Sequence, residues 1–169
     1  PRLRGRTVIE VAERHATLAA LEWALSEARS EAARSADRLK IDPGLLPRLH
    51  GLAAHLVYPT GALRADEALI RDNRFGQHHL WALGISGDLP ILVLRMEAKE
   101  ESPLLGELIR GHQLWHRHGV DVDLVILKTA GSTYFEPVRE EMAAQLREAG
   151  AGYIIGRRGG VHLLFSDQI

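Results

Sequence analysis

The sequence of 169 residues contains no cysteine, and it has no excess of either charge. The first absence excludes disulfide bonds, thiol nucleophiles and cysteine-ligated zinc sites. With 21 Lys and Arg against 22 Asp and Glu, nothing in the charge argues for a surface that binds nucleic acids or anionic membranes, since both usually need a clustered basic excess. No apolar run approaches the roughly 20 residues that cross a bilayer, and the N-terminus lacks the apolar core of a signal peptide. We therefore expect no nucleic-acid partner and no direct membrane contact by this segment.

The remaining composition is that of a globular protein, with 46% hydrophobic and 25% charged residues. A chain of this length can bury a sizeable core in one domain without covalent or metal cross-links. It begins at Pro1 without an initiator methionine and stops abruptly after the sequence HLLFSDQI. We expect residues 1–169 to form a single α/β domain that is excised from a larger multidomain protein.

The first half of the sequence predicts helices and no strand. Its opening is rich in Ala, Leu, Glu and Arg and lacks glycine and proline between residues 6 and 42, which favours a long helix. Helices are expected at residues 8–38, 43–58 and 66–72. Residues 1–74 would then form a helical layer that covers a sheet built from residues 75–169.

The second half alternates aliphatic runs with helical segments. The runs at 89–96 and 120–128 are typical of strands that are buried on both faces of a parallel sheet. Helices are expected at 103–119 and 135–149, and further strands at 153–157 and 161–165. The last two strands would pair antiparallel across the turn Arg158-Gly159-Gly160, which could also bind an anion. The predicted fold is α/β: an N-terminal helical layer on a small mixed, mainly parallel sheet with the order β-α-β-α-β-β.

The stretch FGQHHLWALGISGDLPILVLRM, residues 75–96, raises the question of whether it forms a site or a structural junction. Its glycine-rich turn at 84–88 precedes a strand, whereas phosphate-binding loops follow one. Its glycines therefore predict positive φ in a tight entry to the strand. Leu80 and Trp81 are expected to pack where the helical layer meets the sheet.

A sugar-contacting role is the alternative for the same stretch. Gln77, His78, His79 and Trp81 are the residue types that stack on pyranose rings and form hydrogen bonds with them. Against this role, one of the two adjacent histidines is expected to pack inward and the other to be solvated.

Two further patterns are compatible with metal chemistry. His112 and His116 are four residues apart, so both rings could face one side of a helix and hold a metal if a third ligand came from elsewhere. Their place near a helix C-terminus explains them without a metal, so no metal site is expected. Asp88, Glu97 and Lys99 bracket one strand in the manner of metal-dependent nucleases, and the alternative is a solvated, charged strand end. No cofactor is expected.

The run NRFGQHHLWALGISGDLPILVLR and the downstream LIRGHQLWHRHGVDVDLVILK closely resemble segments of cyclic β-1,2-glucan synthases. The core GISGDLPI is the most specific part of this resemblance, which covers most of the chain. The late segment GGVHLLFSDQI also resembles the sequences of these synthases.

The resemblance implies a piece of a very large inner-membrane enzyme of Gram-negative bacteria. Such synthases transfer glucose from UDP-glucose to β-1,2-glucan and cyclise the product. Their C-terminal part is similar to glycoside phosphorylases, and this part shortens the glucan chains by using phosphate. None of the catalytic residues of that family matches a position here. The resemblance thus implies a non-catalytic α/β module of a glycosyltransferase, at the cytoplasmic face of the membrane as part of the parent. Its expected partners are the neighbouring domains and β-1,2-glucan.

Overall fold

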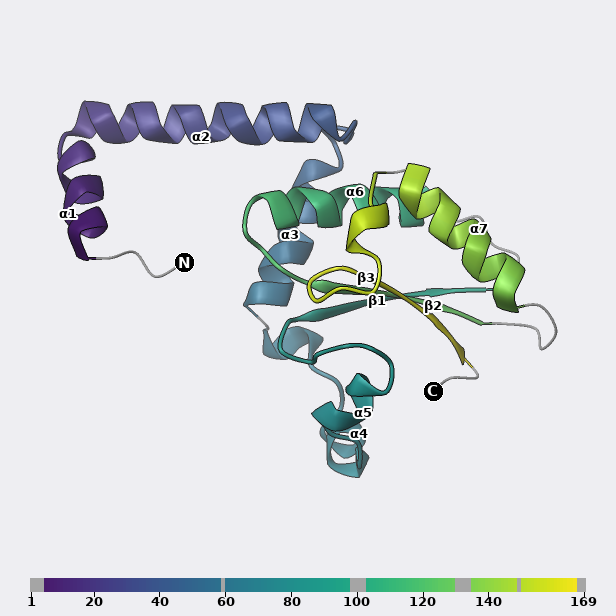
Figure 1. Cartoon of the computed structure of the whole chain (residues 1–169). Helices are drawn as coiled ribbons and strands as arrows, with labels where there is room; N and C mark the ends of the chain where they lie inside the picture. The colour runs from purple at the N-terminus through teal and green to yellow at the C-terminus, as the bar shows by residue number, and fades with distance from the viewer. Residues whose placement is uncertain (1–4, 59, 98–102, 130–134, 149, 167–169) are drawn as a thin grey trace. The chain divides into compact units, whose positions relative to one another are not determined.

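The computed structural model describes residues 5–58, 60–97, 103–129, 135–148 and 150–166. It confirms the predicted α/β class, since the described residues form helices and a three-stranded sheet (Figure 1). The chain divides into two compact units, residues 1–40 and 41–169. The first unit is helical, and the second unit contains the sheet together with the helices from residue 46 onward.

The first unit consists of α1 (Gly5–Arg14) and α2 (Leu18–Arg38), so the prediction of one continuous helix over 8–38 is wrong. The interruption is caused by Thr17, whose backbone is extended and whose side chain accepts a hydrogen bond of 3.2 Å from the Ala20 amide. Because a threonine in this geometry satisfies a free amide at the start of α2, it favours a new helix over continuation of the first.

The second unit begins with helices and continues with an alternation of strands and helices. Its elements are α3 (Leu46–Val57), η1 (Gly61–Leu63), α4 (Glu67–Asp72), α5 (Gln77–Trp81), β1 (Ile91–Met96), α6 (Pro103–Arg117), β2 (Asp123–Lys128), α7 (Phe135–Glu148), η2 (Gly152–Ile154) and β3 (Val161–Phe165). Most of the predicted helices and strands are thereby confirmed to within a few residues. The start of α3 is later than expected, because the Asp42 carboxylate accepts a hydrogen bond of 2.7 Å from the Gly44 amide and forms a turn first.

The sheet has the order β1-β2-β3, and both neighbouring pairs are parallel. The predicted antiparallel partner is therefore wrong, since β3 pairs parallel to β2, and the predicted strand at 153–157 is also wrong. Residues 152–154 instead form η2, where Ile154 is buried in the core cluster beside Met142 and Leu146 of α7. The apolar run before β3 is thus buried by side-chain packing rather than by strand pairing.

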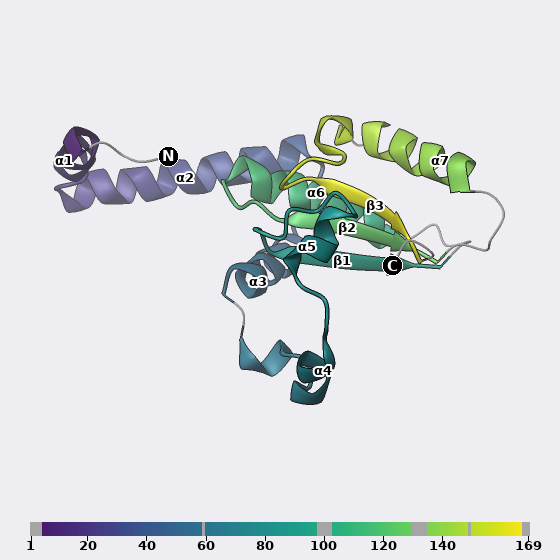
Figure 2. The same cartoon turned by 60° about the horizontal axis from the view of Figure 1, so that its bottom comes forward.

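The two faces of the sheet are covered unequally. One face carries the main core, in which Leu124 and Ile126 are fully buried and to which α6 and α7 contribute Ile109 and Leu146. Helix α7 lies over this face of the sheet (Figure 2). The other face carries a smaller cluster that is covered by the short α5 and the turn after it. Val93 on β1 remains 54% exposed there, so the prediction that this strand is buried on both faces is wrong.

Of the predicted N-terminal helical layer, α3 packs against α6. Leu49 is buried at this contact, and its side chain occupies the place where a side chain on Gly111 would project. Among the described helices, none is both long and apolar enough to cross a membrane.

The start of β3 requires glycine because the backbone of another segment approaches closely. A Cβ atom at Gly160 would overlap the carbonyl oxygen of Ile154 and lie 2.7 Å from that of Arg157. We expect Gly160→Ala to lower the free energy of unfolding by about 2 kcal/mol or more in chemical denaturation, because backbone atoms must move. Gly51→Ala on α3 is the control: no atom lies within 4 Å of its Cβ position, and the change should stabilise the helix by about 0.5 to 1 kcal/mol. Equal changes in the free energy of unfolding for the two substitutions would contradict the close approach of the Ile154 and Arg157 carbonyls to Gly160.

Candidate functional site

The aromatic and imidazole rings around α5 form one group, which we call the α5 ring cluster: Phe75, His78, His79 and Trp81. The Gly76 amide donates a hydrogen bond of 3.0 Å to His79 Nδ1, which fixes this ring over the first turn of the helix. Phe75 meets the His79 ring edge-on, with 4.8 Å between ring centroids, and the His78 and His79 rings are 3.9 Å apart. The His79 ring therefore contacts both the Phe75 ring and the His78 ring.

The cluster is exposed to solvent. Phe75 is 71% exposed, Trp81 is 62% exposed, and both histidines are exposed. The predictions that Trp81 packs at the junction and that one histidine points inward are thus wrong. The five-residue helix instead directs Leu80 toward the apolar cluster below it, as predicted for that residue. Successive helical residues point about 100° apart, so the neighbours of Leu80 face away from this cluster.

Polar groups of α5 hold the turn that leads into β1. Gln77 Nε2 donates hydrogen bonds of 2.9 Å to the Ser86 carbonyl and to Asp88 Oδ1, and the Trp81 indole donates to the same carbonyl at 3.1 Å. Gly84 and Gly87 have φ values of +74° and +73°, which confirms the predicted positive-φ turn. The stretch is therefore a structural junction, and Gln77 acts within it rather than toward solvent.

The same junction still leaves a surface that could contact a ligand. The aromatic faces of Phe75 and Trp81 remain open, and the His78 ring forms no hydrogen bond within the described residues. Such an arrangement offers stacking surfaces with a nearby hydrogen-bonding ring, which is the chemistry that binds pyranosides. Of the four predicted sugar-contacting residues, the structure places three rings on this surface and assigns Gln77 to the turn.

The residues of the nuclease-like pattern are not brought together. Asp88 lies before β1, where it contacts Gln77 and where Arg158 Nε is 3.7 Å from its Oδ2. Glu97 directly follows β1, so a strand of six residues, about 20 Å long, separates the two carboxylates. Lys99 lies outside the described residues. The pair of Arg158 and Asp88 also gives the 157–160 turn an internal partner for its positive charge.

The two histidines of α6 already have protein partners. His112 Nε2 donates a hydrogen bond of 2.8 Å to the Val122 carbonyl, and His116 Nδ1 lies 2.9 Å from Asp121 Oδ1. Burial lowers the pKa of His112, and the nearby His116 adds to this effect. Across the described ranges, no three His, Asp or Glu side chains are grouped as metal ligands.

A buried Asp-His pair was not predicted. Asp123 is fully buried, and its Oδ1 accepts a hydrogen bond of 2.7 Å from the Gly159 amide and lies 3.4 Å from Nε2 of the buried His162. The pair ties the turn before β3 to the first residue of β2. The sequence feature that could have predicted this pair is Asp123 within the apolar run VDVDLVILK. A carboxylate buried in a strand requires hydrogen-bonding partners, so such partners could have been expected.

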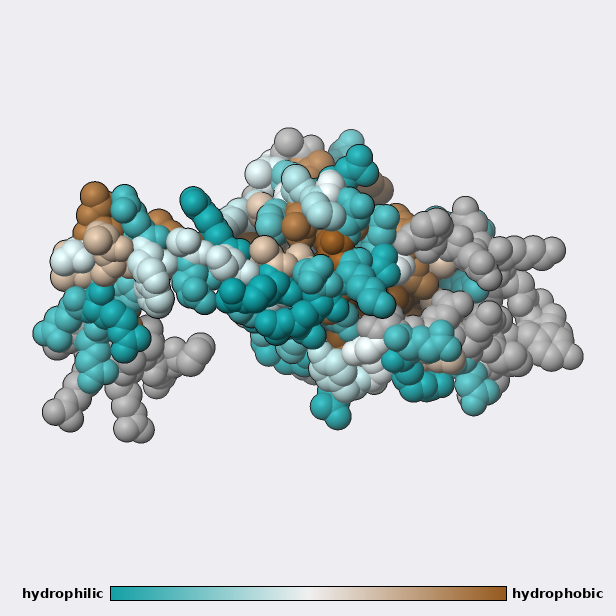
Figure 3. All heavy atoms as spheres, turned by 90° about the horizontal axis from the view of Figure 1, so that it is seen from above, coloured by the Kyte–Doolittle hydropathy of each residue, from teal (hydrophilic) through white to brown (hydrophobic). Residues whose placement is uncertain are grey.

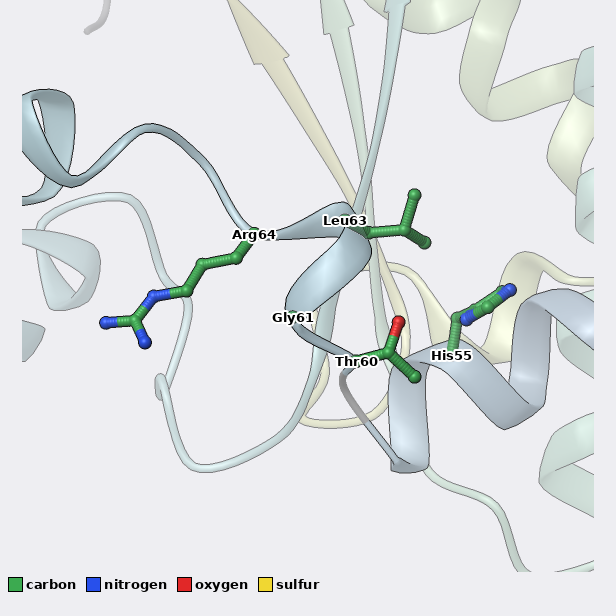
Figure 4. A pocket seen from close by; sticks show the side chains of 5 residues that line it. All are labelled: His55, Thr60, Gly61, Leu63 and Arg64. Carbon is green, nitrogen blue, oxygen red and sulfur yellow. The ribbon is translucent and has the colours of Figure 1, made fainter.

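A hollow of about 500 Å³ lies between the end of α3 and η1, lined by His55, Thr60, Gly61, Leu63 and Arg64. The side chains of Leu63 and Arg64 extend to opposite sides of η1 (Figure 4). The sequence predicted only a loop here, because no motif distinguishes these residues. The side chains of His55, Thr60 and Arg64 have no hydrogen-bonding partner within the described part of the chain.

The comparison with known proteins confirms the resemblance to the glucan synthases. The chain matches no protein-family model. It is 32% identical over 102 residues to the cyclic beta-(1,2)-glucan synthase NdvB of Rhizobium meliloti. The matched part covers 59% of this chain and 4% of that protein, so the chain corresponds to a small portion of its relative.

The buried imidazole of His112 makes stability depend on pH. Because burial holds its pKa below the ordinary 6.5, the unfolded chain binds more protons than the folded chain once the pH falls below that value. We expect the free energy of unfolding to decrease as the pH falls below about 6.5, and His112→Gln, which retains a donor, to reduce this slope. Urea unfolding between pH 5 and 8 measures it. Equal slopes for the unsubstituted protein and for His112→Gln would contradict the role of His112.

Proposed function

We propose that the chain is a non-catalytic module of a larger protein of cyclic β-(1,2)-glucan synthesis, and that it contacts the glucan through the α5 ring cluster. The similarity to the Rhizobium synthase supports the first part. Phe75, just before α5, and Trp81, at its end, are both exposed, and hydrogen bonds from α5 fix the turn that follows it; this observation carries the second part.

The physical basis is the apolar face of a pyranose ring. Its C–H groups pack against an aromatic face, while its hydroxyl groups find hydrogen-bonding partners in solvent or on a neighbouring imidazole. The indole N–H of Trp81 is already bonded to the Ser86 carbonyl, which fixes the ring and lowers the conformational entropy lost on binding. Since the surface is small and open, we expect an affinity in the millimolar range.

A non-catalytic role is supported by the state of the nearby acidic group. Asp88, the carboxylate bonded to α5, is held by Gln77 and lies beside Arg158, so it is a structural acceptor rather than a free acid or base. Glucosyl transfer from UDP-glucose and phosphate-dependent trimming would then belong to other domains of the parent protein, at the cytoplasmic face of the inner membrane. Those domains would be the partners of this module.

The test is a titration with linear and cyclic β-1,2-glucan, followed by amide chemical shifts. We expect shifts to cluster on residues 75–81, and Trp81→Ala to weaken binding by about tenfold through loss of one stacking surface. Trp23→Ala is the matched control, because Trp23 is 68% exposed but lies in the first unit.

Two results would overturn the proposed glucan contact. One is the absence of shifts at millimolar glucan, which would leave a module that only positions neighbouring domains. The other is an equal response to β-1,4-linked glucan oligosaccharides, which would show stacking without selectivity for the linkage.

A further inference from the structure

Helix α2 carries an apolar stripe that nothing in the described structure covers over most of its length. The stripe, which we call the α2 stripe, consists of Leu18, Leu21, Leu25, Ala28 and Ala32. Their spacing alternates between three and four residues, which keeps them on one side of a helix and is the pattern of two-helix packing. The three leucines are 72%, 44% and 49% exposed.

Another side of α2 carries charged residues that pair with one another, together with the exposed Trp23. Arg34 lies 3.0 Å from Glu27 and 2.9 Å from Glu31, and Arg38 is 3.6 Å from Glu31. A helix of 21 residues with one charged and one apolar side gains most of its stability by packing the apolar side. The α2 stripe is therefore an interaction surface, and the question is which partner it fits.

We propose that the α2 stripe packs antiparallel against the same stripe of a second copy of the chain. Its leucines lie in the N-terminal half and its alanines in the C-terminal half. Antiparallel packing places Leu21 against the partner's Ala32 and Leu25 against the partner's Ala28, so every layer joins a large and a small residue at one axial distance. Parallel packing would place leucine on leucine at one end and alanine on alanine at the other, and the axes would diverge.

The charges beside the α2 stripe select the same arrangement. Glu22 and Arg29 flank it on one side, are exposed, and form no ion pair within the described residues. In the antiparallel register above, each Glu22 lies beside the partner's Arg29, which gives two complementary pairs. A shift of seven residues in one direction would bring Glu22 against the partner's Glu22. The opposite shift would bring Arg29 against the partner's Arg29, so both alternatives are repelled.

Charge reversal tests this inference by sedimentation of the 169-residue chain over a range of concentrations. We expect a concentration-dependent dimer, which Glu22→Arg or Arg29→Glu weakens about tenfold because each places two like-charged pairs in the interface. The double variant should restore the dimer. Arg48→Glu, an exposed reversal on α3, is the matched control and should leave the dimer unchanged. A monomer at every concentration, or a double variant weaker than the single variants, overturns the proposal.

The absence of cysteine permits a second test of the orientation. Chains with Leu21→Cys and chains with Ala32→Cys should cross-link to each other when mixed, and neither should cross-link to itself. In the antiparallel register, the two copies of position 21 are separated by about 16 Å along the axis, because the partner's position 21 lies beside position 32, which is 11 residues further along the helix. Efficient cross-linking of either variant to itself would indicate parallel packing and contradict the proposal. This inference is independent of the proposed glucan contact.

Discussion

The pairing of the central strand β2 on both of its edges is the constraint on which the second unit depends. β2 pairs with β1 on one side and with β3 on the other, and both pairs are parallel. Its residues Leu124 and Ile126 are fully buried in the core. Parallel pairing requires each connection to return along the sheet, which α6 and α7 accomplish. Within the described residues the sheet has three strands, so β1 and β3 are its edges, and one face of the sheet is covered only by α5 and the turn after it.

The candidate surface is a consequence of that arrangement. β1 must enter the sheet in register with β2, and the Asp123 amide donates a hydrogen bond of 2.9 Å to the Pro90 carbonyl at this point. The turn before Pro90 is held from α5 by the Gln77 amide and the Trp81 indole. These polar groups therefore point toward the turn, and Leu80 points toward the sheet. The rings of Phe75, His78 and His79 are left exposed to solvent. Exposure of the α5 ring cluster follows from the requirements of strand entry.

The sequence predicted the parts of the fold that local physics determines. The aliphatic runs became β1 and β2, and the helices at 103–119 and 135–149 became α6 and α7 within two residues at either end. The prediction from the sequence failed where contacts between distant residues determine the structure. The run before β3 would be apolar both as a paired strand and as a segment packed beneath α7, so its composition could not distinguish the two. The prediction failed also at the α5 ring cluster, because residue type alone does not tell which side of a five-residue helix faces the sheet.

The two surfaces that carry the functional inferences both break the rule that large apolar side chains are buried. A single exposed leucine or tryptophan on a protein surface needs no explanation, but a group of them held in a fixed geometry does. The α5 ring cluster combines exposed aromatic rings with imidazoles that can form hydrogen bonds, which suits a hydroxylated ring. The α2 stripe is aliphatic, elongated and bordered by opposite charges, which suits another helix. The chemistry of each surface thus indicates a different class of partner, although both surfaces consist of apolar side chains that are exposed to solvent.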